Sequence, residues 1–198
     1  MVKLPTFLSE YRCAGTHEVH SWSFGALHAV RAPSASTWQG TQKTLHDQAI
    51  FGPLRDHVCA CGKYAGREYE NMICDLCGVK LTTPTVRRSR FGHVNLLALI
   101  RHPFGSAGQE IAAFPILPAA FFQSLAGEPL AQAYDNLVIA NQSAEHAEVK
   151  RAVGQVVEVL IPLVTIAHSW NLQDADILAR GLALIRGRES PGSPERSA

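Results

Sequence analysis

Four of the chain's five cysteines form two tight pairs, Cys59 with Cys61 and Cys74 with Cys77. A tight turn can hold the two sulfur atoms of one pair on the same side, and two such turns can bring four thiolates to one point. Tetrahedral Zn²⁺ prefers this donor set, with zinc–sulfur distances of about 2.3 Å. Four protein ligands leave no coordination position for a reactive water. The spacing therefore predicts one structural zinc ion.

Glycines support this interpretation. Gly62 follows Cys61 and Gly78 follows Cys77. Glycine tolerates a positive φ, which a chain needs where it turns tightly around a metal ion. Both glycines are therefore expected in left-handed turns.

Two other interpretations of the thiols have less support. A thioredoxin-like redox centre at Cys74 and Cys77 needs a preceding strand and a following helix that lowers a thiol pKa, and neither pattern surrounds this pair. Disulfides are typical of oxidising compartments. The N-terminal residues lack the apolar core of a signal peptide, so we expect a cytoplasmic protein. Cys13 is unpaired and is expected to be a small buried hydrophobe.

Composition allows a packed core but does not indicate a partner. The chain has 198 residues, 46% of them hydrophobic, and its 18 basic and 17 acidic residues leave a net charge of +1. Any attraction to nucleic acid must therefore come from local clusters of charge. The most apolar run, residues 152–167, is shorter than a bilayer span and contains Glu158 and Pro162. We expect a core helix there and no membrane association.

The pattern along the chain predicts an α+β protein: a small β-hairpin zinc-knuckle module with an attached, mainly α-helical C-terminal part. Residues 1–49 are predicted to be irregular and 50–110 to form the zinc-binding module, with the pattern already turning helical from about residue 94. Residues 111–187 are predicted to be helical and 188–198 to be a disordered tail.

Four helices are expected in the C-terminal part. Proline and glycine delimit a short helix over 118–127, and a second helix follows over 129–142. A third covers 152–167, where Pro162 is expected to kink or end it. A fourth is predicted from about Asp174 to Ile185, so the Asp-Ala-Asp sequence at 174–176 is expected to begin a helix rather than to bind a metal.

A one-signed basic stretch follows the second cysteine pair. No acidic residue lies between Asp75 and Glu110, whereas five basic residues do: Lys80, Arg87, Arg88, Arg90 and Arg101. Such stretches attract phosphates. They can equally be a solvated face, or arginines paired with acids elsewhere in the fold, and charge alone does not separate these alternatives.

Several motifs in this region resemble a known family. "IFGPLRDHVCACGKY" (50–64), "ICDLCGV" (73–79) and "VRRSRFGHVNL" (86–96) are similar to the N-terminal zinc-binding region of the bacterial RNA polymerase β′ subunit, with matching cysteine spacing. "SWSFG" (21–25) resembles the family's Arg-Ser-Trp-Ser-Phe-Gly motif, with His20 at the place of the arginine. The resemblance covers residues 19–100 and thins beyond them.

The resemblance implies a role in transcription, with DNA or RNA backbone and RNA polymerase subunits as partners. In the family this region belongs to the clamp, near upstream DNA and exiting RNA. It implies nucleic-acid contacts for five residues: Lys63, Arg67, Arg87, Arg88 and Arg90, of which Arg67 rests on position alone.

The family's catalytic Asn-Ala-Asp-Phe-Asp-Gly-Asp motif is absent from this sequence. We therefore expect no catalytic residue and no RNA polymerisation by the chain alone, although the family is that of a nucleotidyltransferase. The alternative is a zinc-stabilised protein-interaction module that has left transcription and docks a partner through its apolar helices.

Histidines and aromatic residues give weaker signals. His17 and His20 have the spacing of a possible second metal site but no carboxylate or cysteine partners, so surface or packing roles are expected. His93 is expected to be structural. Trp22 and Phe24 could stack on bases, but packing under the zinc module is the preferred prediction.

Overall fold

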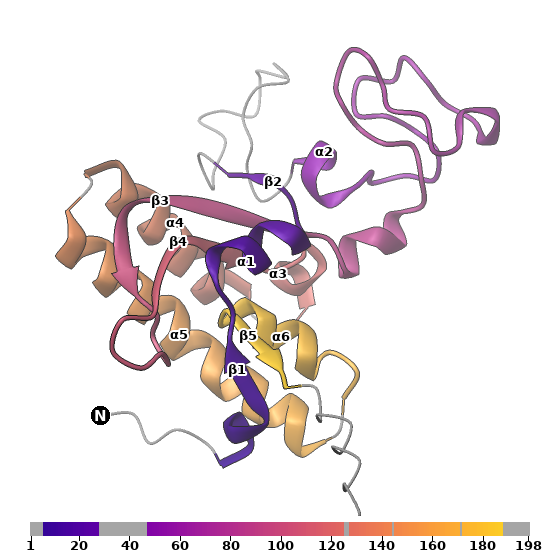
Figure 1. The fold of residues 1–198 in the computed structure, drawn as a ribbon. Coiled ribbons are helices and arrows are strands. Elements are labelled where there is room, and N and C mark those ends of the chain that lie inside the picture. Colours follow the sequence, from indigo (N-terminus) through magenta and orange to yellow (C-terminus); the bar gives the residue numbers. More distant parts are fainter. Residues whose placement is uncertain (1–5, 28–46, 125–126, 144, 171, 188–198) are drawn as a thin grey trace, which may run out of the picture.

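Buried apolar side chains gather into two separate cores, one large and one small. A computed structural model of the chain describes residues 6–27, 47–124, 127–143, 145–170 and 172–187. The large core lies in a body of helices and strands, and the small core lies in a lobe that projects from one end of the body (Figure 1). Helices and small sheets together make this an α+β fold, which confirms the predicted class.

Helices and strands alternate irregularly along the chain. The α-helices are α1 (Thr16–Trp22), α2 (Gln48–Phe51), α3 (Ala120–Ser124), α4 (Gly127–Ser143), α5 (His146–Ser169) and α6 (Ala175–Gly181). The strands are β1 (Tyr11–Cys13), β2 (Ser23–Ala26), β3 (Phe91–Arg101), β4 (Glu110–Ile116) and β5 (Leu184–Arg186). Three short 3₁₀ helices complete the described elements: η1 (Thr6–Glu10), η2 (Arg67–Tyr69) and η3 (Pro84–Arg88).

A three-stranded sheet in the order β2-β3-β4 forms one layer of the body. β2 runs parallel to β3, and β3 and β4 form an antiparallel hairpin. The prediction of helix from about residue 94 is therefore wrong as far as the end of β4 at Ile116, and the first helix after the sheet, α3, begins at Ala120. In β3, Val94, Leu96 and Ile100 face the core while Leu97 and Leu99 face outward. These outward leucines remove the polar alternation by which a half-buried strand is recognised.

A second, two-stranded sheet joins segments from the two ends of the described chain. β1 pairs antiparallel with β5, with Tyr11 opposite Arg186, and the Ala14 amide donates to the Ala183 carbonyl at 2.8 Å. The described part of residues 1–49 thus forms regular elements, which differs from the predicted irregular segment. Its pairing partners come from residues far along the chain, so no local pattern reveals them.

The helices pack on the sheet and supply most of the large core. α4 and α5 lie side by side and both contact β3 (Figure 1). α5 has the length and apolar composition of a membrane-crossing helix. Its buried stripe nevertheless packs inside the body: Val149, Ala152, Val153, Val156, Leu160, Val164 and Ala167. The predicted core helix at 152–167 is therefore present, and it is longer at both ends.

Pro162 does not end α5, which continues to Ser169. The proline removes one backbone donor, which frees the carbonyl of Glu158 four residues earlier. Because Pro162 is exposed, water can reach this side of the helix and hydrogen-bond to the freed carbonyl. The solvent position of the proline explains why the helix tolerates it.

The remaining boundaries also differ from the predicted division. The boundary at residue 110 would cut the β3–β4 hairpin, so the body is one unit that includes the sheet. The predicted last helix is shorter, because α6 ends at Gly181 and the chain continues into β5. The predicted tail, 188–198, lies outside the described residues.

Two glycines in the body should respond oppositely to alanine. In α5, a Cβ added at Gly154 meets nothing within 4 Å, so Gly154→Ala removes only the entropic cost of glycine in a helix. At Gly181 the added Cβ would lie 2.8 Å from Cδ2 of buried Leu117. We expect Gly154→Ala to raise the free energy of unfolding by about 0.5–1 kcal/mol, and Gly181→Ala to lower it by about 1–3 kcal/mol.

Urea denaturation followed by far-ultraviolet circular dichroism measures both changes. The unaltered chain is the common reference. Shifts of the same sign for the two variants would contradict this packing.

Candidate metal centre and its attachment to the body

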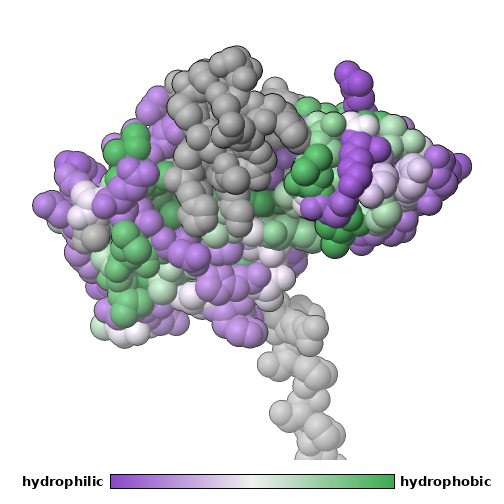
Figure 2. All heavy atoms as spheres, turned by 90° about the horizontal axis from the view of Figure 1, so that it is seen from above, coloured by the Kyte–Doolittle hydropathy of each residue, from purple (hydrophilic) through white to green (hydrophobic). Residues whose placement is uncertain are grey.

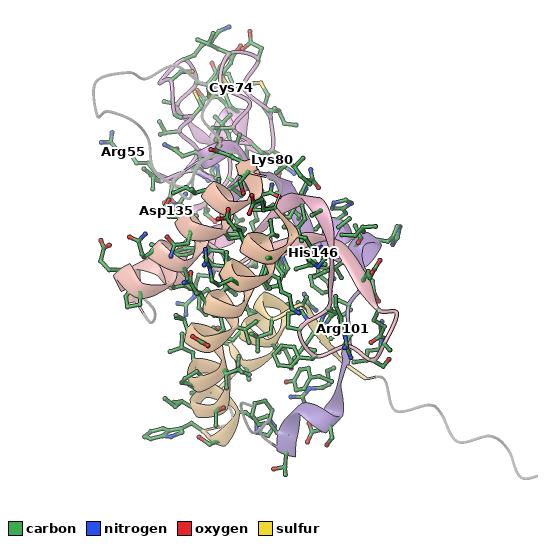
Figure 3. All side chains as sticks on the ribbon, turned by 90° about the vertical axis from the view of Figure 1, so that its left-hand side faces the viewer. Arg55, Cys74, Lys80, Arg101, Asp135 and His146 are labelled. Atoms are coloured by element: carbon green, nitrogen blue, oxygen red, sulfur yellow. The ribbon has the colours of Figure 1, made fainter. Side chains whose placement is uncertain are left out.

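The projecting lobe is built almost entirely from loops. Its core consists of Cys59, Cys74, Val79 and Leu81, with a few half-buried residues around it. Isolated bridges stand where β-hairpins were predicted, for example between Ile73 and Lys80. Figure 3 shows Cys74 near the outer end of the lobe and Lys80 where the lobe meets the body. So small an apolar core does not stabilise a fold by itself.

The four paired cysteines converge within this lobe. Their sulfur atoms all lie within 4.8 Å of one another. Sγ of Cys61 is 3.3 Å from Sγ of Cys59 and 3.5 Å from Sγ of Cys74. Zinc–sulfur bonds of about 2.3 Å in a tetrahedron correspond to sulfur–sulfur distances of about 3.8 Å, whereas a disulfide needs about 2.05 Å. The thiols are unbridged, and the four could hold a metal ion.

Two similar turns bring the thiols together. Gly62 has φ of 74° and Gly78 has φ of 69°, which confirms the predicted left-handed conformation of both glycines. The Gly62 amide donates to the Cys59 carbonyl at 3.1 Å, and the Gly78 amide donates to the Cys74 carbonyl at 2.8 Å. The Tyr64 amide donates to Sγ of Cys59 at 3.2 Å. Backbone geometry thus arranges the sulfur atoms without help from a large core.

Close packing of the thiols affects their ionisation. A hydrogen bond from the Lys63 amide lowers the pKa of Cys61, but desolvation and hydrogen bonds with the other three thiols outweigh it and raise the pKa to about 12. Thiolates crowded in this way need a cation to balance their charge. The cluster therefore has the chemistry of a cation site rather than of an activated redox thiol.

An exposed ion pair joins the two turns. Nζ of Lys63, two residues after Cys61, lies 2.6 Å from Oδ2 of Asp75, which lies inside the Cys74–Cys77 turn. This hydrogen bond raises the pKa of Lys63 and lowers the pKa of Asp75. Lys63 therefore has a role within the lobe in addition to the predicted contact with nucleic acid.

Arg87 connects the two chain segments that join the lobe to the body. Its side chain is buried, with 6% of the residue exposed, and Nη1 donates to the Gly52 carbonyl at 2.7 Å. Gly52 follows α2 at the point where the chain enters the lobe, and Arg87 lies in η3 at the point where the chain leaves the lobe. Gly52 has φ of 105°, and a Cβ there would collide with Val86. Desolvation lowers the pKa of Arg87. We call this junction of Gly52, Val86 and Arg87 the neck.

The other predicted nucleic-acid residues have different surroundings. Arg90 is buried beside the neck, and its guanidinium lies 4.7 Å from the ring centre of Phe24, a cation–π contact that ties β2 to the start of β3. Arg88 is exposed, with Nη2 3.8 Å from Oδ2 of Asp174 at the start of α6. Arg67 is exposed in η2.

The five residues predicted to contact nucleic acid thus include both surface cations and buried arginines at or beside the neck. Lys63, Arg67 and Arg88 reach solvent, whereas Arg87 and Arg90 are turned into the structure. Sequence reasoning treated Arg87, Arg88 and Arg90 alike because charge patterning does not report burial. The structural role of Gly52 was missed, and no local pattern linked Gly52 to Arg87 or Phe24 to Arg90.

The remaining candidates take packing or capping positions. Nε2 of His20 lies 3.0 Å from Oδ1 of Asn95, and Nδ1 of His93 lies 2.7 Å from Oγ of Ser23. Among the described residues, the four cysteines form the only group of three or more metal-ligating side chains. Asp174 begins α6 at its N-cap position, as the helix interpretation of residues 174–176 predicted.

Trp22 and Phe24 differ in exposure. The Trp22 ring lies 6.3 Å from the ring of Phe91 and 5.6 Å from the guanidinium of Arg180. Trp22 thus has a packing role, but it packs against the large core of the body rather than under the zinc module as predicted. Phe24 remains 57% exposed beneath Arg90.

Comparisons with known proteins identify relatives of part of the chain. No protein-family profile matches it. It is 42% identical over 89 residues to the DNA-directed RNA polymerase subunit β′ of Lactobacillus delbrueckii subsp. bulgaricus, which covers 45% of this chain and 7% of that protein. The β′ subunits of Rhodopirellula baltica and Aquifex aeolicus are 43% and 42% identical over 89 residues, again covering 45% of this chain and 6% of each relative.

These relatives agree with the motifs in the sequence. The chain spans less than a tenth of the length of each of these β′ subunits. The converging cysteines supply the metal-binding geometry that the resemblance implied. The chain therefore contains a region related to the β′ subunit of bacterial DNA-directed RNA polymerase, which confirms the resemblance that its motifs carry.

Proposed function

We propose that this protein is a zinc-stabilised, β′-like protein that acts in transcription by binding nucleic acid and components of RNA polymerase. The observation that carries the proposal is the convergence of four thiols in a chain whose relatives are RNA polymerase β′ subunits. The chain lacks the catalytic aspartate motif, so the proposed role is binding rather than nucleotidyl transfer. A cluster of free thiols suits the reducing cytoplasm, which is the proposed location.

We propose one Zn²⁺ ion per chain, bound by Cys59, Cys61, Cys74 and Cys77. Zinc would supply the cation that four thiolates need, and it would replace the apolar core that the lobe lacks. With four cysteine ligands there is no position for a substrate, so the ion would be structural. The body has its own core and would not depend on the metal.

Loss of one thiol should therefore unfold the lobe alone. We expect Cys77→Ser to lower the zinc content from one ion per chain to well below one, because a hydroxyl is a poor zinc ligand. Most helical circular dichroism should remain, since α1 and α3–α6 belong to the body. Metal analysis and far-ultraviolet circular dichroism measure the two effects.

Cys13→Ser is the matched control, because Cys13 lies in β1, outside the cluster. It should retain the full zinc content. A Cys77→Ser protein that still binds one zinc ion, or a natively folded lobe in protein stripped of metal, would refute the structural role.

Nucleic-acid binding is proposed through cations on the surface of the lobe and neck. Arg67 and Arg88 are exposed, so their guanidinium groups are accessible to phosphate oxygens. Lys63 is also exposed, but its ammonium group already forms an ion pair with Asp75. Arg87 and Arg90 would contribute by holding the lobe in place rather than by contacting phosphate. Such contacts would be largely insensitive to base sequence.

A double variant measures the contribution of the two exposed arginines to binding without changing Arg87 or Arg90. We expect Arg67→Ala with Arg88→Ala to weaken binding of single-stranded RNA and duplex DNA. The slope of log K against log salt should become shallower by about 2, because two phosphate contacts are lost. Fluorescence anisotropy over a range of salt concentrations measures this slope.

The control is Arg151→Ala on α5, whose side chain is also exposed, at 73%. It should leave the slope unchanged. Equal slopes for the double variant and the unaltered chain would exclude these two arginines as phosphate contacts.

A second candidate function is favoured by the apolar surface of the lobe. Leu54, Ile73 and Leu76 are 58–66% exposed. Seen from above, the outer edge of the lobe is hydrophilic and hydrophobic patches lie nearer the body (Figure 2). A protein-interaction module outside transcription would use such residues. Its affinity would change little with salt, and affinity purification from native cells would recover no RNA polymerase subunits.

A further inference from the structure

A groove lies in the body on the far side from the cysteine cluster. It is bounded by the β3–β4 connection and by the first half of α5, and its volume is about 430 Å³, within the range of small-molecule sites. Figure 3 shows Arg101, at the end of β3, well separated from Cys74 in the lobe. This groove is independent of the β′-like function proposed above.

One stripe of α5 forms a wall of the groove. Lys150, Val153, Gly154, Val157 and Ile161 recur at helical spacing and all line it. A Cβ added at Gly154 would meet nothing within 4 Å, so open space lies beside this residue. Larger side chains at this position would project into the groove. The apolar wall therefore has a hollow at Gly154.

The opposite wall is held in place by a buried histidine. Nε2 of His102 donates to the Ala183 carbonyl at 2.9 Å, and Nδ1 accepts from the Phe104 amide at 3.1 Å. Both ring nitrogens are thus used, and desolvation lowers the pKa of His102, which keeps the ring neutral. These hydrogen bonds hold the backbone at Phe104, which lines the groove together with Ile100. The wall is preformed rather than assembled by a ligand.

Charge at the rim has one sign. Lys150 lies at the N-terminal end of the α5 stripe, and Arg101 lies at the end of β3. Nη2 of Arg101 donates to the Gly105 carbonyl at 3.2 Å, which holds the guanidinium along the rim. Among the described residues that line the groove there is no acidic side chain. An apolar hollow with cations at its mouth complements an amphipathic anion.

We propose that this groove binds a small amphipathic carboxylate, with its hydrocarbon part over Gly154 and Val157 and its carboxylate at Lys150. Decanoate is the probe, used with the full chain below its micelle-forming concentration, and decylammonium is the probe of opposite charge. Isothermal titration calorimetry measures both affinities. The unaltered chain should bind decanoate saturably and more tightly than decylammonium.

Three variants test the position of the ligand. Gly154→Leu fills the hollow and should weaken decanoate binding at least about tenfold. Lys150→Glu should weaken decanoate binding by about tenfold and strengthen decylammonium binding. Arg151→Glu makes the same change of charge one residue further along α5, outside the groove lining, and should alter both affinities less than about twofold.

Thermal unfolding of each variant checks that the body is intact. If Gly154→Leu does not fold, the surface pair Lys150→Glu and Arg151→Glu decides the question. The proposal is overturned if the unaltered chain shows no saturable binding. It is also overturned if a folded Gly154→Leu binds as well as the unaltered chain, or if the two glutamate variants behave alike.

Discussion

The lobe depends on the meeting of four thiol groups at one point. Its apolar core is too small to offset the entropy of ordering so many loop residues. Two glycine turns place the sulfur atoms, and an ion pair between Lys63 and Asp75 joins the turns at the surface. A cation at the centre would be the main stabilising contact of this part of the molecule. The body has no such requirement, because its helices and sheets bury a large core.

The neck joins two parts of the molecule whose buried cores differ greatly in size. Arg87 donates to the Gly52 carbonyl, so the segments entering and leaving the lobe are held together on the body side. Arg90 adds a contact with Phe24 in β2. Because the body has its own core, it would stay folded if the lobe lost its order. The neck contact would fix the direction of the ordered lobe. Both properties would suit the binding role proposed for the lobe.

Local patterns in the sequence predicted the convergence of the four cysteines well and the body less well. Cysteine spacing and the glycines after each pair lie within a short stretch, so the site could be predicted without knowing the rest of the fold. The roles of Arg87 and Arg90 could not, because burial depends on Gly52 and Phe24, which are distant in sequence. The sequence pattern did not indicate a strand at β3, because β3 has apolar residues on both of its faces.

The pairing of β1 with β5 has a consequence for how the chain folds during synthesis. Tyr11 is among the first described residues and Arg186 among the last, yet they lie opposite each other. On the ribosome, β1 must wait for nearly the whole described chain before it finds its partner strand. The lobe has all four thiols within one short stretch, so the metal ion proposed for it could bind long before that. The lobe can therefore fold before β1 pairs with β5 and the body reaches its final structure.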